Sequence, residues 1–203
     1  MSEQLSSLNV MIDIETFGRR PRGLVVSIGA VLFDTLKEIP PTDVASEFHA
    51  VLSWEAALAE SRFEKNLETL DWWHEKQPTA YARLRELMKL STLNMTQLLV
   101  QFCDWVAPLC QGGAKVWGNS PSFDLVQLEN ATKEVGIRFP IPYGAENDYR
   151  TLTDLVYGST SKPRPPENIA HDALADARFQ ARVCAQALQQ VERWKPRDAA
   201  IQA

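Results

Sequence analysis

The chain has few of the features that mark secreted, membrane-spanning or zinc-binding proteins. Its 203 residues include only three cysteines and three histidines, with no CxxC pair, so neither a disulfide framework nor a cysteine-based zinc site is expected. There is no run of about 18 apolar residues and no charged start followed by an apolar segment. We therefore expect a soluble, unexported protein with no membrane attachment and with reduced, mostly buried thiols at Cys103, Cys110 and Cys184.

An excess of positive charge is also missing. The net charge of −5 at pH 7 argues against a protein that holds nucleic acid on a broad basic surface. It does not exclude a nuclease whose cluster of acids is offset by bound cations. The hydrophobic share of 45% and the charged share of 23% are ordinary globular values. We expect one domain over residues 1–203, with a core at about 9–194 and flexible ends.

Three short β-rich segments open the chain, at residues 9–14, 25–34 and 46–52. Glycine and proline residues between them suit turns, so these segments predict an antiparallel three-strand meander. A fourth strand is expected at 114–118. Together with the helices described next, they predict an α/β fold in which a mixed sheet is flanked by helices.

Apolar periodicity, together with glycine and proline, predicts the helices. They are a segment at 66–89 interrupted at Pro78, a helix capped by Thr96 and ended by Gly112, a helix from about Asp124 to Gly136, a short helix at 151–157 and a long one from about Asp172 to Trp194. Residues 139–147 and 161–168 are expected to be loops, the second exposed and mobile, and the tail after Pro196 to be frayed.

Two acids stand two residues apart in the first strand. Asp13 and Glu15 follow an apolar run, and alternate residues of a strand project from the same face. Two neighbouring carboxylates at the end of a hydrophobic strand repel each other and lose hydration, and a bound divalent cation relieves both effects. The alternative for this pair alone is a solvated strand end.

Three more candidates lie near predicted helix starts. Asp124 ends the motif WGNSPSFD, and its alternative is an ordinary helix N-cap. His171 and Asp176 lie in HDALADA, where a spacing of five does not place two helical residues on one face. We therefore expect His171 to precede the last helix and Asp176 to point at the same site from its first turns. The alternative is a cap by Asp172, a surface Asp176 and a structural histidine.

The combination of these residues favours one site. Four carboxylates gathered at one end of a sheet can hold Mg²⁺ or Mn²⁺, which prefer oxygen ligands, in a centre that cleaves phosphodiester bonds. A neutral histidine can take a proton from an attacking water near pH 7.

The motifs VMIDIETFG (10–18), VWGNSPSFD (116–124) and HDALADA (171–177) resemble those of the DEDDh class of DnaQ-like 3′→5′ exonucleases, in the RNase H-like superfamily. SIGAVLFD (27–34), TLDWWHEKQ (69–77) and YRTL (149–152) resemble further marks of a small bacterial and phage branch, which includes an exoribonuclease-like group and a T-even phage exonuclease. The resemblance covers about residues 9–190. It implies an RNase H-like sheet and a location in the cytoplasm of a bacterial or phage-infected cell.

The resemblance also implies roles for the motif residues. Asp13, Glu15 and Asp176 would hold the cation that activates water, and Asp13 would bridge to a second cation that Asp124 reaches directly or through water. The two ions, Mg²⁺ or Mn²⁺, would lie roughly 3.5–4 Å apart. His171 would be the general base. The partners would be 3′ ends of single-stranded DNA or RNA and a nucleoside monophosphate product, with DNA slightly favoured by the phage relatives; a homodimer is left open.

Substrate-binding roles are carried over for six residues, namely Thr16, Phe17, Gly18, Asn119, Phe123 and Arg150. The first three would line the pocket of the 3′-terminal nucleotide, with ordinary core packing as the alternative for Phe17. Asn119 and Phe123 would shape the second motif. Arg150 would contact a phosphate or a carboxylate, with a buried structural ion pair as its alternative.

Two features of the sequence are harder to assign. Asp172 stands where the family would have a neutral residue, and a carboxylate there would either raise the pKa of His171 or cap the helix. Trp72 and Trp73 are adjacent, so a helix points them in different directions, and we expect at least one of them in the core.

Three other functions compete with this reading. The first is a catalytically idle nucleic-acid-binding domain, although all five motif residues are present. The second is an oligoribonuclease-like enzyme that clears short RNA, and the third is a proofreading subunit.

Overall fold

The computed structural model describes residues 8–35, 46–166 and 170–194. The frayed ends expected from the sequence, and the last residues of the loop expected at 161–168, lie outside the described residues. Within the described part of the chain, no helix is both long and apolar enough to cross a membrane.

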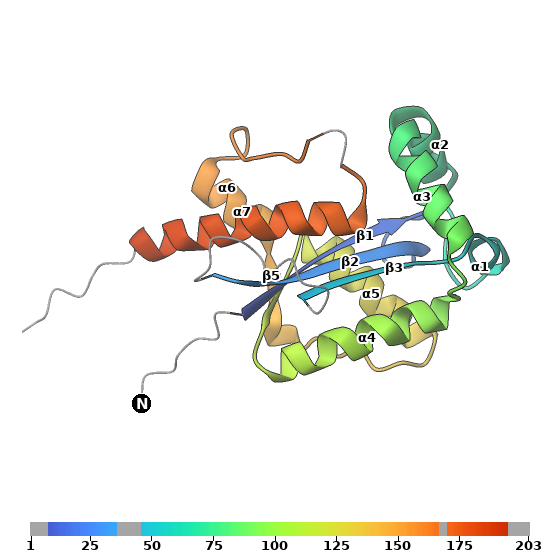
Figure 1. Cartoon of the computed structure of the whole chain (residues 1–203), viewed down its shortest axis with the longest axis horizontal. Coiled ribbons are helices and arrows are strands. Elements are labelled where there is room, and N and C mark those ends of the chain that lie inside the picture. The colour runs from blue at the N-terminus through green and yellow to red at the C-terminus, as the bar shows by residue number, and fades with distance from the viewer. Residues whose placement is uncertain (1–7, 36–45, 167–169, 195–203) are drawn as a thin grey trace, which may run out of the picture.

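A five-stranded mixed sheet forms the centre of the fold, in the order β3-β2-β1-β4-β5 (Figure 1). The strands β1 (Leu8–Thr16), β2 (Val25–Asp34) and β3 (Glu47–Val51) form the predicted antiparallel meander. Strand β4 (Lys115–Gly118) then pairs parallel to β1, and β5 (Glu146–Asp148) pairs parallel to β4. The predicted mixed sheet flanked by helices is therefore confirmed. Strand β5 was expected to be loop, because its three polar residues carry no apolar periodicity.

The helices are α1 (Trp54–Ala59), α2 (Leu67–Lys76), α3 (Pro78–Leu90), α4 (Met95–Gln111), α5 (Pro121–Glu134), α6 (Tyr149–Tyr157) and α7 (Ala173–Trp194), with a 3₁₀ turn at Tyr143–Ala145. The predicted interruption at Pro78 is confirmed, since Gln77 ends α2 and Pro78 begins α3. Helix α1 was not predicted.

Two predicted helix starts are wrong by a few residues. Helix α4 is capped by Asn94 rather than Thr96, because the Asn94 side chain and that of Gln97 form a reciprocal capping box. Helix α5 begins at Pro121, three residues before Asp124, and proline is well suited to the first helical position. Gly136 follows the end of α5 with a φ of 76°, which confirms its predicted role as the terminating glycine.

Each face of the sheet has its own helices (Figure 1). Helices α6 and α7 cover one face and α4 and α5 the other. In β1, Val10 and Ile12 belong to the core on the α4–α5 side, whereas Met11 belongs to the core under α7. Because side chains alternate along a strand, Asp13 and Glu15 project toward α7. The strand runs to Thr16, two residues beyond its predicted end, so Glu15 lies within it.

Gly29 sets how closely α7 approaches the sheet. It pairs with Asp13 in the β1–β2 register, and a Cβ added to it would lie 2.2 Å from the carbonyl carbon of Ala173, the first residue of α7. The missing side chain therefore lets the start of α7 sit directly over the acidic end of β1.

Replacing this glycine should displace α7. We expect Gly29→Ala to lower the free energy of unfolding by about 1–3 kcal/mol through overpacking and to weaken activity by moving the start of α7. Urea unfolding followed by circular dichroism measures the first effect. Gly144→Ala is the control, since an added Cβ there meets nothing within 4 Å; equal effects of the two substitutions would contradict the close approach.

Candidate metal centre

The first two acids lie at the end of β1, facing α7. Glu15 is buried, and Asp13 is partly buried. The Oδ1 atom of Asp13 accepts a hydrogen bond from Nε2 of Gln180, at 2.8 Å. The alternative of a solvated strand end is wrong for Glu15, which is buried, whereas Asp13 is partly exposed and hydrogen-bonded to α7.

Asp124 approaches the same end of β1 from α5, on the opposite face of the sheet. It lies in the first turn of α5 and is 3% exposed. Its Oδ2 atom accepts a hydrogen bond from the main-chain N–H of Asn119, at 3.0 Å, and its carboxylate also accepts one from Ile14, the residue between the two β1 acids. The N-cap alternative is wrong, since Ser120 occupies that position. Gly118 makes room for this arrangement, because a Cβ there would lie 3.0 Å from Oδ2 of Asp124.

His171 and Asp176 complete the group from the start of α7. His171 precedes the helix as predicted, in a left-handed conformation with φ of 61°. Its main-chain N–H donates to Oδ2 of Asp176, at 2.7 Å. Donor atoms of Glu15, His171 and Asp176 all lie within 4.8 Å of one another. The structure thus brings all five motif residues to one end of the sheet.

Burial and mutual repulsion shift the pKa values of these acids upward. Burial raises the pKa of Asp124 to about 7 and that of Asp176 to about 6. The pKa values of Asp13 and Glu15 are raised well above their ordinary values, first by burial and then by the neighbouring carboxylates. Without a counter-charge, this group of acids therefore resists full ionisation near neutral pH.

Asp172 acts as a helix cap rather than as a partner of the histidine. Its Oδ1 atom accepts a hydrogen bond from the N–H of Ala175, at 3.0 Å. The pKa of His171 is lowered, first by burial and then by the positive charge of Arg83. The expectation that Asp172 would raise the pKa of His171 is wrong, while the alternative expectation of a cap is confirmed.

Two tryptophans enclose the histidine. Trp73 is 1% exposed, and its Nε1 donates to the carbonyl oxygen of Thr16, at 3.0 Å, which ties α2 to the end of β1. Trp72 is 38% exposed, and its ring meets that of His171 edge-to-face with centroids 4.9 Å apart. The prediction that at least one of the pair lies in the core is confirmed.

A cavity of about 1160 Å³ opens over the acids. Five of the six predicted substrate-binding residues line it, namely Thr16, Gly18, Asn119, Phe123 and Arg150. Phe17 is absent from the lining; it is 4% exposed and packs edge-to-face on Tyr81. The structure thus places Phe17 in the core, the alternative that was left open for it. Arg150 is exposed, so a buried structural ion pair is wrong for it.

Gln180 is a residue of the site that the sequence interpretation missed. It lies four residues after Asp176 on α7, so both project from one face of the helix. It lines the cavity and binds Asp13, and its Oε1 atom is buried without a hydrogen-bond partner. The spacing of four residues from Asp176 could have indicated that Gln180 faces the same site. A glutamine does not by itself indicate a role in a metal site, so its contact with Asp13 had to be seen in the structure.

The donor set fits divalent cations. Oδ1 of Asp176 is buried and has no hydrogen-bond partner, although Oδ2 of the same carboxylate is satisfied. A buried carboxylate oxygen without a partner destabilises the fold unless a cation binds it. Oxygen donors at Asp13, Glu15, Asp124 and Asp176 are those that Mg²⁺ and Mn²⁺ prefer.

The pKa values of the acids predict a pH-dependent stabilisation by metal. Asp124 and Asp176 ordinarily ionise near pH 3.8 but, when folded, near about 7 and about 6. Between those limits the folded state holds more protons than the unfolded state, so the stability of the metal-free protein should fall as pH rises.

Added Mg²⁺ or Mn²⁺ should therefore raise the melting temperature more at about pH 8 than at about pH 5. Differential scanning fluorimetry with EDTA or with each metal measures this difference. A shift that is equal at both pH values, or absent at both, would contradict the assignment of the acids as ligands.

The sequence of the chain matches a model of one protein family. The family is described as the 3′-5′ exoribonuclease Rv2179c-like domain, and the match covers residues 8–188. No curated protein matches the chain by sequence.

Solved structures of several nucleases share the fold. The nuclease domain of 3′hExo, a DEDDh family member bound to rAMP, is similar with a TM-score of 0.54 and 14% identity, over 93% of this chain and 95% of that one. E. coli exonuclease I in complex with a dT13 oligonucleotide gives a TM-score of 0.58 and 13% identity, over 91% of this chain and 41% of that one. The RNase domain of yeast Pop2 gives a TM-score of 0.55 and 11% identity, over 92% and 79%. The RNase H-like α/β fold is thereby confirmed.

Proposed function

Since this chain belongs to the Rv2179c-like 3′-5′ exoribonuclease domain family and is a 3′-5′ exonuclease, we propose that it releases nucleoside monophosphates from single-stranded 3′ ends at the site around Asp13. The observation that carries the proposal is the meeting of four carboxylates and one histidine over a large open cavity. A site of this composition suits hydrolysis of a phosphodiester.

The four acids would bind the cations. Asp13, Glu15, Asp124 and Asp176 would together hold two Mg²⁺ or Mn²⁺ ions. The bound ions would supply positive charge for the phosphate and would lower the pKa of a water molecule. Gln180 would keep Asp13 oriented through the hydrogen bond to its Oδ1 atom.

His171 would act as the general base. It would accept a proton as the water oxygen bonds to phosphorus and the bond from phosphorus to the 3′ oxygen of the penultimate nucleotide breaks. The lowered pKa of His171 keeps the imidazole neutral near pH 7, which is the form able to accept a proton. The left-handed main chain and the hydrogen bond to Asp176 fix its position.

RNA is the proposed substrate. The family is described by an exoribonuclease activity, and one structural neighbour was solved with rAMP bound. Another neighbour was solved with a DNA oligonucleotide, and the resemblance of the motifs to phage relatives slightly favoured DNA. Discrimination between the two depends on contacts to a 2′-hydroxyl.

Digestion of matched 5′-labelled RNA and DNA oligonucleotides tests polarity and substrate together. We expect a ladder that shortens from the 3′ end with Mg²⁺ or Mn²⁺, faster on RNA, and none with EDTA. A strand blocked at its 3′ end should survive. Release of the labelled 5′ nucleotide first would contradict the polarity, and faster loss of DNA would reverse the choice of substrate.

A further inference from the structure

We propose that Arg20 and Arg164 form a second phosphate-binding subsite at the mouth of the cavity, which holds the substrate backbone on the 5′ side of the scissile bond. The inference rests on the proposed function and deepens it, because it makes an extended single strand a better substrate than a dinucleotide. It follows from how the positive charges around the cavity are held.

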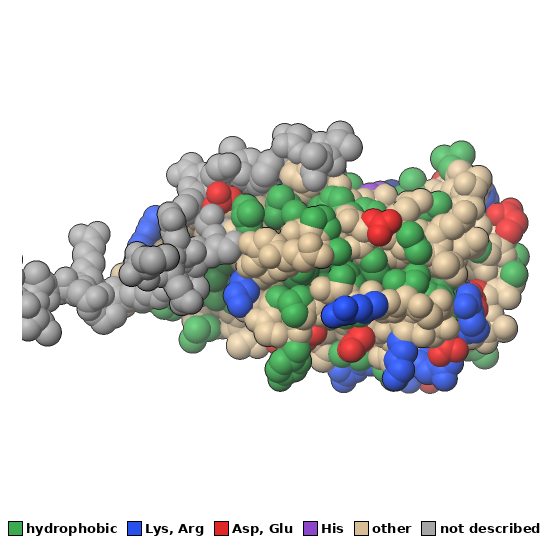
Figure 2. Space-filling model, turned by 90° about the horizontal axis from the view of Figure 1, so that it is seen from below, with side chains coloured by type: hydrophobic (Ala, Val, Ile, Leu, Met, Phe, Trp, Pro, Cys, Tyr) green, Lys and Arg blue, Asp and Glu red, His purple; other side chains and the backbone are tan. Residues whose placement is uncertain are grey.

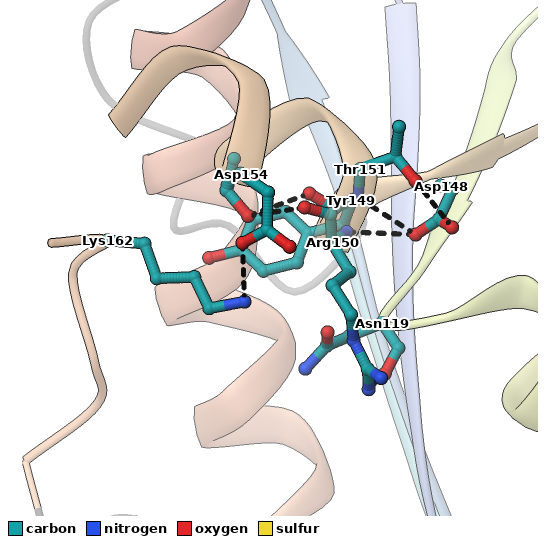
Figure 3. Close-up of polar contacts among 8 residues, drawn as sticks. Asn119, Asp148, Tyr149, Arg150, Thr151, Asp154 and Lys162 are labelled. Carbon is teal, nitrogen blue, oxygen red and sulfur yellow. Dashed lines mark hydrogen bonds and ion pairs between the residues drawn. The ribbon is translucent and has the colours of Figure 1, made fainter. Parts of the chain in front are cut away.

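Lys and Arg side chains outnumber acidic ones in the lining of the cavity. Besides the four acids, its lining contains Arg19, Arg20, Arg150, Lys162 and Arg164. Arg19 forms an ion pair with Glu68, and Nζ of Lys162 lies 2.9 Å from Oδ1 of Asp154 (Figure 3). The other three arginines form no ion pair with any described residue. The charges of Arg20 and Arg164 therefore remain available to a ligand.

Main-chain carbonyl groups orient two of these arginines. Nη1 of Arg20 donates to the carbonyl oxygen of Ser122, at 3.3 Å, and to its Oγ atom, at 3.1 Å. Nη2 of Arg150 donates to the carbonyl oxygen of Asn119, at 3.2 Å (Figure 3). Arg150 thus contacts the loop before α5, and Arg20 contacts the first turn of α5. A neutral carbonyl fixes the side chain without cancelling its charge, and the remaining N–H groups can bind a phosphate.

Arg164 is presented by a stiff segment. It stands between Pro163 and Pro165, and all three residues line the cavity. The rings fix φ on both sides, so less conformational freedom is lost when a ligand orders the segment. The side chain is exposed and makes no hydrogen bond within the described part of the chain.

The size of the cavity, and the distribution of charge over the rest of the molecule, support binding of an extended single strand at the cavity. Its volume of about 1160 Å³ exceeds the range of about 300–1,000 Å³ typical of a pocket for one small ligand. The chain as a whole carries a net charge of −5. On the face that α4 crosses, Lys and Arg side chains are interspersed with Asp and Glu (Figure 2). The unpaired arginines at the cavity are therefore the better place for a phosphate backbone.

Two substrates that differ only on the 5′ side of the scissile bond test the subsite. One is an oligonucleotide, and the other is the p-nitrophenyl ester of the same nucleoside 5′-monophosphate, which has no upstream phosphate. In Arg20→Gln and in Arg164→Gln we expect the ratio of kcat/KM for the oligonucleotide to that for the ester to fall about tenfold, through loss of a charge-assisted contact. Arg182→Gln, an exposed arginine of α7 outside the cavity, should leave the ratio unchanged.

Binding without turnover gives a second readout. Fluorescence anisotropy of a labelled oligonucleotide in EDTA should show weaker binding in both variants. The slope of log affinity against log salt should shrink by about 0.7 for each arginine removed. Loss of Arg20 could also disturb the first turn of α5, where it contacts Ser122. The result for Arg164→Gln is then decisive, because Arg164 makes no hydrogen bond or ion pair with a described residue.

The outcomes separate this inference from the proposed function. Wild-type protein that hydrolyses neither substrate would remove the proposed function. Wild-type protein active on both, with an unchanged ratio and salt slope in Arg164→Gln, would overturn the subsite alone.

Discussion

Asp13→Asn should abolish nuclease activity and, at the same time, stabilise the protein in the absence of metal. We expect kcat/KM to fall at least about 10³-fold, because one of the proposed cation ligands is lost. In EDTA at neutral pH the variant should be more stable than wild type, and should unfold at a higher urea concentration. The reason is that the pKa of Asp13 is raised by burial and by Asp124, Glu15 and Asp176, so its charge destabilises the fold when no cation is bound.

Asparagine keeps the side-chain oxygen that accepts the hydrogen bond from Gln180, so the change removes charge rather than shape. Activity on a 3′-labelled oligonucleotide and urea unfolding in EDTA and in Mn²⁺ measure the two effects. Asp104→Asn, on the exposed side of α4, is the matched control and should alter neither. Retained activity, or a metal-free variant less stable than wild type, would contradict the proposed role of Asp13.

His171→Asn should lower kcat by about 10²–10⁴-fold, the usual contribution of a general base, with little change in KM. Asparagine suits this position because it tolerates the left-handed conformation that His171 adopts, with φ of 61°. Wild-type activity at saturating metal should decline only below the ordinary histidine pKa of 6.5, since burial and Arg83 lower the pKa of His171. Only the neutral imidazole accepts a proton, so acid removes the active form.

In His171→Asn, kcat should be low and should no longer decline at acidic pH. This decline of kcat at acidic pH is the acid limb of the profile. Profiles of kcat from about pH 5 to pH 8 for wild type and His171→Asn make the comparison. His74→Asn, an exposed histidine of α2, is the control and should keep both the rate and the limb. An unchanged acid limb in His171→Asn would show that another group controls the profile.

The parts of the fold predicted correctly carry strong local signals. Alternation in β1 placed Asp13 and Glu15 on one face, and apolar runs identified β2 and β4. The positions of the five motif residues also suggested one site, and the structure brings them together. That convergence depends on sheet order, which places β4 beside β1, and periodicity along the chain does not give that order.

The errors have two physical origins. Some signals were present but were given too little weight: Asn94 with Gln97 forms a capping box, and Pro121 begins α5. Other features exist only through tertiary contact. Strand β5 is three polar residues stabilised by pairing with β4, and Gln180 joins the site because α7 packs over β1.

The central claim is that the acids at the end of β1 bind two divalent cations. A crystal structure with Mn²⁺ and a nucleoside monophosphate, with an anomalous difference map for manganese, tests it most directly. We expect two manganese peaks at the end of β1, held by the carboxylates of Asp13, Glu15, Asp124 and Asp176. Full Mn²⁺ occupancy elsewhere with no peak at Asp13, or a nucleotide bound remote from these acids, would contradict it.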